Sequence, residues 1–296
     1  MKELVIISGK GGTGKTSITA AFASLAQNFV LADCDVDAAD LHLVTVPVIK
    51  EKQEFSGGKQ ASIISEKCIG CGKCAEMCRF GAINLNGLAN DAKEKTYTVD
   101  PISCEGCKVC VEFCPAEAIE FKEAINGQWF VSDTRFGPMV HAKLGIAEEN
   151  SGKLVTLIRK KAKDIANLQK KDLLIVDGSP GIGCPVIASI TGADLVLVVT
   201  EPTLSGIHDL ERVAQLTKNF GIQTLVCVNK ADINPELTEK IEKDAREKGL
   251  KVIGKIPYDE SFTKAQIMKA TLIEYTSGDI AEKVKSMFRE VIYALG

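Results

Sequence analysis

The apolar positions of the chain form short, nearly continuous runs that are separated by longer amphipathic stretches. Such runs of valine, isoleucine and leucine are typical of strands buried on both faces of a parallel sheet. The stretches between them have the apolar spacing of helices. We therefore predict an α/β fold with a mostly parallel sheet and helices on both faces. The expected strands are 4–7, 29–32, 173–176, 195–200, 225–228 and 252–256, and the expected helices include 153–168, 207–220 and 236–248.

This pattern is interrupted after the second expected strand by a cysteine-rich segment with few apolar runs. Residues 55–59, which read Phe-Ser-Gly-Gly-Lys, precede the segment, and Asn126-Gly127 follows it. Glycine and Asn-Gly pairs favour turns, so we interpret both places as the borders of an insertion. The expected organisation is a small α+β domain at 59–125, inserted into a larger domain made of 1–58 and 126–296.

Eight of the eleven cysteines form two runs with the same spacing, C-x2-C-x2-C-x3-C, and the second run repeats the first after 36 residues. The repeat resembles bacterial-type two-cluster 4Fe-4S ferredoxins over roughly residues 61–121. In that family, three cysteines of a run bind one cluster and the fourth binds the other. The resemblance therefore implies that cluster 1 is bound by Cys68, Cys71, Cys74 and Cys114, and cluster 2 by Cys78, Cys104, Cys107 and Cys110.

Zinc and disulfides are the alternative uses of these cysteines. Zinc sites usually combine two separated C-x2-C pairs, whereas each run here supplies four closely spaced thiolates. Disulfides need an oxidising compartment, and the first residues of the chain lack the charged and then apolar pattern of a signal segment. We therefore expect a cytoplasmic protein with reduced thiols. Arg79 replaces the proline that usually follows such a run, which predicts a more polar setting for cluster 2.

Composition and charge narrow the range of partners. The chain has 296 residues, of which 45% are hydrophobic, enough for a sizeable core. Its formal net charge of −3 offers no basic surface for nucleic acid, and no apolar run approaches the ~18 residues that span a bilayer. An apolar stripe at 280–295 resembles a membrane-binding helix, but Glu282 and Glu290 favour packing on the sheet. We expect neither nucleic acid nor a membrane as a partner.

The segment after the first expected strand matches the phosphate-binding pattern G-x4-G-K-[ST] and precedes an expected helix. In such a loop the backbone N–H groups surround the phosphates, Lys15 contacts the β- and γ-phosphates, and the Thr16 hydroxyl binds Mg²⁺. The nucleotide-binding residues expected here are Gly9, Lys10, Gly11, Gly12, Thr13, Gly14, Lys15, Thr16 and Ser17.

A second lysine in the loop, Lys10, indicates which family of P-loop proteins the chain resembles. With residues 33–37 and 177–181, two segments that each begin with an aspartate, it gives a set of motifs that resembles the MinD/ParA/nitrogenase-iron-protein family of P-loop ATPases. The resemblance covers nearly the whole chain outside the insertion. It implies that Lys10 reaches the nucleotide of the facing subunit, in a homodimer that forms when ATP binds.

The same resemblance assigns roles to the residues after two strands. It implies that Asp35 orients the attacking water and contacts the magnesium shell, that Asp177 binds magnesium through water, and that Gly181 senses the γ-phosphate. The catalytic residues expected on this basis are Lys10, Lys15 and Asp35. The expected magnesium ligands are Thr16, Asp35 and Asp177.

The base-binding residues are predicted from two further segments. Residues 229–232 read Asn-Lys-Ala-Asp, like the guanine-reading motif of GTPases. In the MinD family, however, an asparagine after this strand hydrogen-bonds adenine, and residues 256–259 look like the base-side loop of that family. We favour ATP over GTP because Lys10 and both aspartate segments follow the ATPase pattern. Asn229 and Pro257 are the expected base contacts.

Together the cysteine runs and the ATPase motifs predict an ATP-dependent redox protein. It would be a nucleotide-gated homodimer that passes low-potential electrons to a redox or metalloprotein client. Two alternatives stay open. The chain is a carrier that loads iron-sulfur clusters or another metal onto a client, or it is a positioning switch whose clusters sense redox state. Cys184 lies seven residues after Asp177, as a cluster cysteine does in the nitrogenase iron protein, but we find no second cysteine to complete a bridging site.

Overall fold

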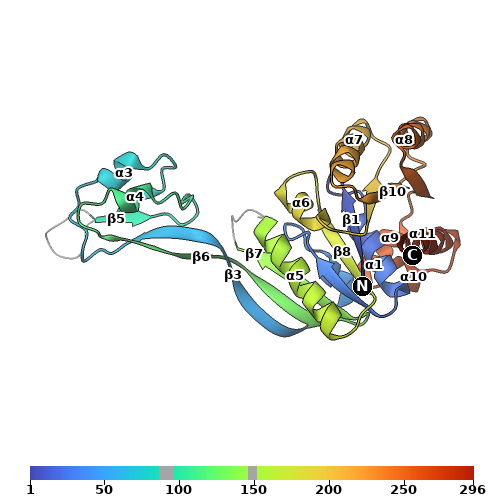
Figure 1. The fold of residues 1–296 in the computed structure, drawn as a ribbon, viewed down its shortest axis with the longest axis horizontal. Coiled ribbons are helices and arrows are strands. Elements are labelled where there is room, and N and C mark those ends of the chain that lie inside the picture. Colours follow the sequence, from blue (N-terminus) through green and yellow to red (C-terminus); the bar gives the residue numbers. More distant parts are fainter. Residues whose placement is uncertain (87–95, 146–151) are drawn as a thin grey trace. The chain divides into compact units, whose positions relative to one another are not determined.

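The computed structural model describes residues 1–86, 96–145 and 152–296, and it divides the chain into two compact units (Figure 1). The described parts of Met1–Gln53, Trp129–Lys143 and Asn150–Gly296 form the first unit, which we call the P-loop unit. Those of Glu54–Gln128 and Leu144–Glu149 form the second, the cysteine unit. The chain passes between the units inside two long strands, β3 (Val48–Ile63) and β6 (Ile119–Asp133), and again between Lys143 and Leu144.

The main sheet has the strand order β11-β10-β9-β1-β8-β2-β7-β6-β3. Its central strands pair in parallel: β1 with β8 and β9, β2 with β7 and β8, and β10 with β9 and β11. Parallel pairing places all of their carboxyl ends at one edge, where ligands bind in such sheets. The strands not yet bounded are β1 (Lys2–Ser8), β2 (Phe29–Asp33), β7 (Pro138–Leu144), β8 (Leu173–Pro180), β9 (Leu195–Thr200), β10 (Gln223–Asn229) and β11 (Lys251–Ile256).

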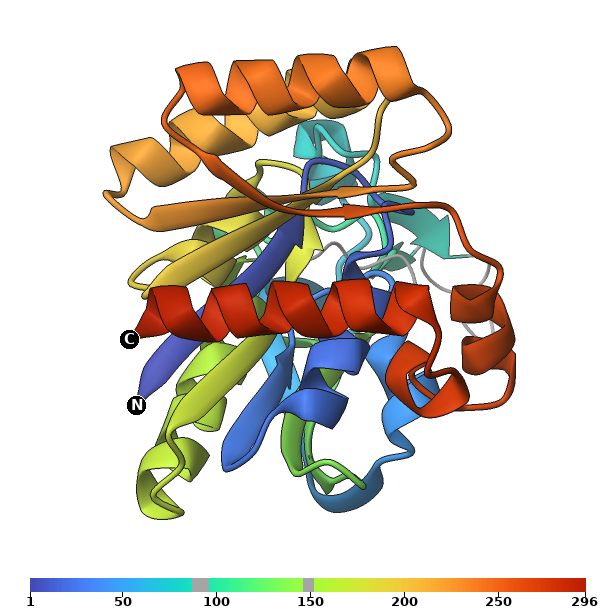
Figure 2. The same cartoon turned by 90° about the vertical axis from the view of Figure 1, so that its right-hand side faces the viewer.

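Helices cover both faces of this sheet, as Figure 2 shows for α8 and α11 on opposite sides of β10 and β11. On one face lie α1 (Lys15–Leu25), α2 (Leu41–Thr45), α9 (Ser261–Ile267), α10 (Leu272–Tyr275) and α11 (Asp279–Leu295). On the other lie α5 (Gly152–Leu168), α6 (Cys184–Ile190), α7 (Leu204–Asn219) and α8 (Pro235–Glu247).

The α/β fold predicted from the sequence is confirmed, and so is the packing of the C-terminal helix. The apolar stripe of α11, which includes Ile280, Val284 and Met287, is buried against the sheet together with Leu4 and Ile6. Among the residues that the structure describes, no helix is long and apolar enough to cross a membrane.

The two expected turns at the borders of the insertion were wrong. Residues 55–59 lie inside β3, and Asn126-Gly127 lies inside β6. The physical reason is a contact between these strands: the Gly57 N–H donates to Asn126 Oδ1 at 2.7 Å. A tertiary hydrogen bond thus overrides the local turn preference of glycine and asparagine.

The cysteine unit is built on a structural repeat. The helices α3 (Lys73–Met77) and α4 (Val109–Glu112) start 36 residues apart and pack on each other, and β4 (Ile83–Asn86) pairs antiparallel with β5 (Thr96–Val99). Backbone conformations with positive φ also recur at this interval, at Gly70 and Gly106 and at Gly72 and Lys108.

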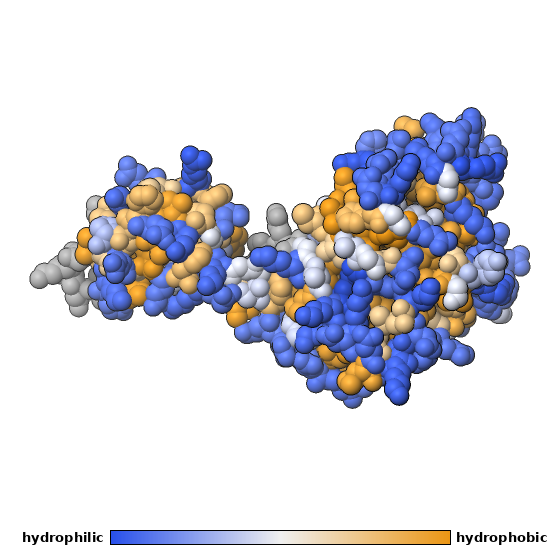
Figure 3. All heavy atoms as spheres, viewed as in Figure 1, coloured by the Kyte–Doolittle hydropathy of each residue, from blue (hydrophilic) through white to orange (hydrophobic). Residues whose placement is uncertain are grey.

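Hydrogen bonds across the repeat are reciprocal. The Ile64 N–H donates to Ala118 O at 2.8 Å, and the equivalent Asp100 N–H donates to Ala82 O at 2.7 Å. Each half of the cysteine unit therefore closes on the other, in a pseudo-twofold arrangement. Apolar side chains reach the surface of this unit, among them Ile69, Phe80 and Ile102 (Figure 3).

Candidate functional site

The glycine-rich loop joins the end of β1 to the start of α1. Gly14 precedes the helix with a φ of +91°, and a Cβ there would lie 2.4 Å from Asn229 Nδ2. A Cβ at Gly9 would lie 2.2 Å from the Cβ of Asp209. Both positions therefore need glycine. No side chain caps the N-terminus of α1, so its first N–H groups are available to an anion, as in a phosphate-binding loop.

Lys15 lies at the centre of a buried charge cluster at the carboxyl edge of the sheet. Its Nζ donates to Asp177 Oδ1 at 2.8 Å and forms an ion pair with Asp35 Oδ2 at 3.2 Å. Thr16 Oγ1 donates to the other oxygen of Asp177 at 2.7 Å, and Thr19 Oγ1 donates to Oδ1 at 2.8 Å. The structure thus brings together four of the residues expected to bind phosphate or magnesium.

Burial shifts the protonation of this cluster. It raises the pKa of Asp33 well above its ordinary value, and the nearby charge of Asp177 adds to the shift. Burial also raises the pKa of Asp35, although Lys15 opposes the change. For Lys15 itself, burial acts to lower the pKa, but Asp177 and Asp35 outweigh it and the pKa is raised. Three carboxyl groups thus surround one ammonium, and a bound cation would stabilise their ionised forms.

Three buried oxygen atoms at this edge have no hydrogen-bond partner among the residues that the structure describes: Thr13 Oγ1, Asp33 Oδ2 and Asp35 Oδ1. Buried polar atoms are nearly always paired in native proteins, so an unpaired group points to a ligand. Carboxylate oxygens are the ligands that Mg²⁺ prefers, and it usually reaches them together with substrate phosphates. The residues present therefore fit a magnesium-bound nucleotide.

The second lysine of the loop is held within its own chain. Lys10 Nζ forms an ion pair with Glu201 Oε1 at 2.6 Å and donates to Ser205 Oγ at 3.0 Å. The other oxygen of Glu201 binds Lys230 Nζ at 2.9 Å, and Lys230 also donates to the carbonyl of Gly12 at 3.0 Å. One glutamate therefore links the loop to the residue after β10.

The expected base contacts lie beside the same loop. Asn229, at the end of β10, donates from Nδ2 to the carbonyl of Thr13 at 2.8 Å. Asp232 Oδ1 accepts from the Tyr258 N–H at 2.6 Å, which fixes the loop that follows Pro257. Gly181, the expected γ-phosphate sensor, donates from its N–H to Ser8 O at 2.8 Å. Their roles in binding a base or a phosphate stay predictions.

Three residues of this site were not predicted individually. Asp33 ends β2 opposite Asp177, Thr19 lies one helical turn after Lys15, and Glu201 follows β9. Two signals were present in the sequence. A residue four positions after Lys15 lies on the same face of the helix, and the carboxyl ends of neighbouring parallel strands meet at one edge.

The cysteines of the two runs lie around two separate cavities of the cysteine unit. Each cavity has a volume of about 20 Å³. The cysteines that line the first are Cys68, Cys71, Cys74 and Cys114. Those that line the second are Cys78, Cys104, Cys107 and Cys110. Each cavity thus receives three cysteines of one run and the last cysteine of the other.

All eleven cysteines are free thiols. Burial, with the neighbouring thiols Cys104 and Cys107, raises the pKa of Cys110 to about 11. Within 1–86, 96–145 and 152–296, no group of three or more His, Cys, Asp or Glu side chains is arranged to hold a metal ion.

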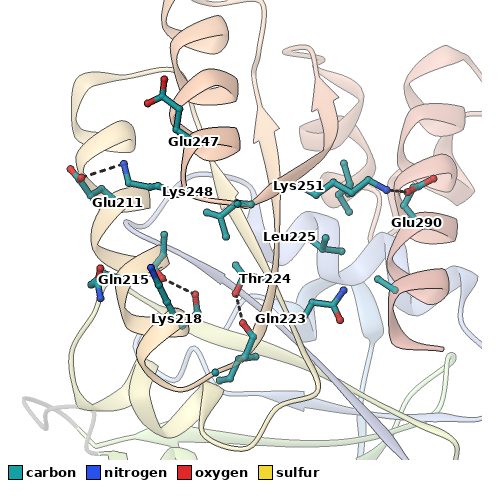
Figure 4. Close-up of a pocket in the computed structure, with 18 of the residues that line it drawn as sticks. Glu211, Gln215, Lys218, Gln223, Thr224, Leu225, Glu247, Lys248, Lys251 and Glu290 are labelled. Atoms are coloured by element: carbon teal, nitrogen blue, oxygen red, sulfur yellow. Dashed lines mark hydrogen bonds and ion pairs between the residues drawn. The ribbon is translucent and has the colours of Figure 1, made fainter.

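A larger cavity, of about 750 Å³, lies at the other edge of the sheet, where β10 and β11 begin (Figure 4). Several of its charged side chains already form ion pairs: Lys248 Nζ lies 3.3 Å from Glu211 Oε1, and Lys251 Nζ lies 2.6 Å from Glu290 Oε2. None of the residues expected to bind nucleotide lines it.

A glycine-rich loop between a strand and a helix, with a buried lysine and carboxylates at the carboxyl edge of a parallel sheet, defines a P-loop nucleotide-binding protein. The family is also shown by comparison with known proteins. Residues 4–272 match the model of the CobQ/CobB/MinD/ParA nucleotide binding domain, and the chain belongs to that family.

Several relatives span almost the whole chain. The chain is 32% identical to the uncharacterised protein MJ0578 of Methanocaldococcus jannaschii, over 98% of this chain and 96% of that protein. It is 24% identical to the uncharacterised ATP-binding protein MJ0084 of the same organism, over 89% of this chain and 91% of that protein.

Solved structures share the fold. One is a chain of the MinC:MinD cell division protein complex of Aquifex aeolicus, with a TM-score of 0.59 at 16% identity over 99% of this chain and 96% of that one. Another is the septum site-determining protein MinD complexed with Mg-ADP from Pyrococcus horikoshii, with a TM-score of 0.55 at 16% identity over 98% and 95%. At these identities the likeness concerns the fold alone.

Proposed function

We propose that the chain is an ATP-hydrolysing iron-sulfur protein, a nucleotide-gated homodimer that transfers low-potential electrons to a partner protein. The observation that carries this proposal is the sorting of eight cysteines into two crossed sets of four, in the same chain as a P-loop charge cluster. Two-cluster ferredoxins need this crossed ligand set, because the fourth cysteine of each run binds the cluster of the other run.

The sorting of the cysteines supports clusters over single ions. A zinc ion draws thiolates to about 2.3 Å from one point. Here each set of four combines three cysteines of one run with the last cysteine of the other, which is the ligand set of a two-cluster ferredoxin. The cubes would supply one-electron chemistry, while the protein supplies the thiolates and the apolar walls that set the potential.

In this proposal the P-loop unit hydrolyses ATP. Lys15 would contact the β- and γ-phosphates, and Thr16, Asp35 and Asp177 would hold magnesium. Asp35 has one oxygen toward Lys15 and one without a partner, which suits a carboxylate that positions water. ATP is the proposed nucleotide because several relatives are named ATP-binding proteins.

Iron analysis of the anaerobically purified protein tests the redox half. We expect about eight iron and eight sulfide per chain, and a reduced electron paramagnetic resonance spectrum of two interacting 4Fe-4S centres. A double substitution of Cys68 and Cys71 by serine should remove about half of the iron, whereas the same change at the buried Cys34 and Cys227 leaves the iron content unchanged. Stoichiometric zinc, or about four iron per chain in the parent protein, would contradict the proposal.

A second candidate is a carrier that delivers clusters to a client. One observation favours it: Cys71 and Cys107, one thiol of each set, are exposed. A solvent-exposed ligand makes a cluster easier to release. Anaerobic transfer to an iron-free ferredoxin distinguishes the two. Transfer within minutes, faster with ATP, indicates a carrier, and retention over hours with electron transfer indicates a redox protein.

A further inference from the structure

Glu201 is the point at which two lysines of the nucleotide site meet. It follows β9 directly, and its side chain is 14% exposed. Oε1 lies 2.6 Å from Lys10 Nζ, and Oε2 lies 2.9 Å from Lys230 Nζ. Burial acts to raise the pKa of Glu201, but hydrogen bonds from the two lysines outweigh it and lower the pKa. The carboxylate is thus held ionised between two cations.

The ammonium of Lys10 has its hydrogen-bond partners in its own chain. Besides Glu201, it donates to Ser205 Oγ at 3.0 Å and to Thr203 Oγ1 at 3.3 Å, both at the start of α7. An ammonium has three donors, and three oxygens are within reach. In this arrangement Lys10 is not available to a second subunit.

We infer that Glu201 is a positioning residue that retains Lys10 in its own subunit, so that nucleotide-dependent dimerisation has to break the Lys10–Glu201 pair. The inference rests on the proposed function in one respect, namely that Lys10 acts on the nucleotide of the partner subunit. No motif of the sequence assigns a role to Glu201.

Lys230 lowers the free-energy cost of breaking the ion pair between Lys10 and Glu201. An isolated buried charge is strongly unfavourable, so a carboxylate that lost its only cation would resist the exchange. Here Lys230 stays on Glu201 when Lys10 leaves. Lys230 also holds the carbonyl of Gly12, so the loop keeps one of its two links to Glu201 during the change.

Glu201→Gln tests the inference because it keeps the shape of the side chain and removes its charge. A neutral amide binds an ammonium more weakly than a carboxylate does. Lys10 should then leave its own subunit more readily. At saturating nucleotide we expect dimerisation at a roughly fivefold lower protein concentration, the equivalent of one partly exposed ion pair. Glu211→Gln is the matched control, since Glu211 forms an ion pair with Lys248 at the remote cavity (Figure 4).

Two measurements separate this inference from the proposed function. The first is the rate at which Lys10 is acetylated in the nucleotide-free protein, measured by mass spectrometry. A paired ammonium reacts slowly, so Glu201→Gln should increase the rate several-fold and Glu211→Gln should not. The second is analytical ultracentrifugation with magnesium and a non-hydrolysable ATP analogue.

Faster acetylation of Lys10 together with easier dimerisation supports the inference. Unchanged acetylation overturns it, because Glu201 then does not hold Lys10. Faster acetylation with unchanged or weaker dimerisation also overturns it, because the pair then does not oppose association. If the parent protein and both variants stay monomeric with the analogue, the homodimer of the proposed function is refuted, and the role of Glu201 in dimerisation is refuted with it.

Discussion

The P-loop unit and the cysteine unit fill their interiors in different ways. The first surrounds apolar strands with helices and buries two charge clusters: Lys15 with Asp35 and Asp177 at the carboxyl edge, and Glu3 with Arg159 near the start of β1. The second has a small apolar interior and two cavities walled by thiols. One unit satisfies most of its own polar groups, and the other leaves space that its side chains do not fill. The comparison suggests that the P-loop unit folds before it binds its ligand and that the cysteine unit folds around its ligand.

Removal of iron gives the largest expected effect. After anaerobic chelation, the cysteine unit should lose its fold, because its described residues bury few apolar side chains, among them Phe55, Ile83 and Ile119. Metal binding to thiolates commonly supplies on the order of 10 kcal/mol of folding free energy. Hydrogen exchange should show lost protection at the amides of Ile64 and Asp100, which link the two halves.

The P-loop unit is the internal control in that experiment. Amides of its central strand β1 should keep their protection after chelation, because their sheet partners lie in the same unit. If Ile64 and Asp100 stay protected without iron, the cysteine unit folds on its own and the contrast between the units is wrong.

The sequence predicted the two units unequally well. Both ends of strand β9 were predicted correctly, because a short continuous run of β-branched and leucine side chains is typical of a buried strand. Strand β8 continues past the predicted end to Pro180, because its pairing with β1 continues to Ser8. Strands β3 and β6 were missed, since their pairing depends on a contact between residues 57 and 126 that no local pattern shows.

The residues of the candidate sites were also predicted unequally well. Motifs located Lys15, Asp35 and Asp177, because phosphate-binding loops need particular residues at fixed spacing. Glu201 belongs to no motif, and its role depends on which strands are neighbours in the sheet. The crossed sorting of the cysteines was predicted from the spacing of the runs and their likeness to ferredoxins, and not from any packing argument.

Asp35→Asn tests whether the charge cluster catalyses ATP hydrolysis. The amide keeps a hydrogen bond but cannot polarise water as the carboxylate does, so we expect turnover of ATP to fall by about 10²- to 10⁴-fold with nucleotide binding retained. Phosphate release and nucleotide titration measure the two quantities. Asp164→Asn, on the exposed side of α5, is a matched control. Turnover equal to that of the parent would remove Asp35 from the catalytic residues.

Lys15→Ala and Lys10→Ala should distinguish the roles of the two lysines of the loop. Loss of the Lys15 ammonium removes charge-assisted hydrogen bonds to phosphate, and we expect roughly 10- to 100-fold weaker nucleotide binding. Lys10→Ala should leave binding by the monomer nearly unchanged and abolish dimerisation with ATP and magnesium. Calorimetry and light scattering measure these effects. A Lys10→Ala protein that still forms a dimer would refute the role of this lysine across the subunits.

The smallest expected effect tests whether the two units communicate at all. The chain passes between the units within β3 and β6 and again at the end of β7, and β7 pairs with β2 next to Asp33. A change at the nucleotide site should therefore alter the free energy of the clusters. Coupling between sites is typically ~1 to 3 kcal/mol and is reciprocal, which for a one-electron couple is roughly 40 to 130 mV. Potentiometric titration without nucleotide, with ADP, and with a non-hydrolysable ATP analogue measures the shift. Potentials that agree within about 10 mV, less than a twofold change in an equilibrium constant, would mean that the units act independently, and the carrier would then be the better proposal.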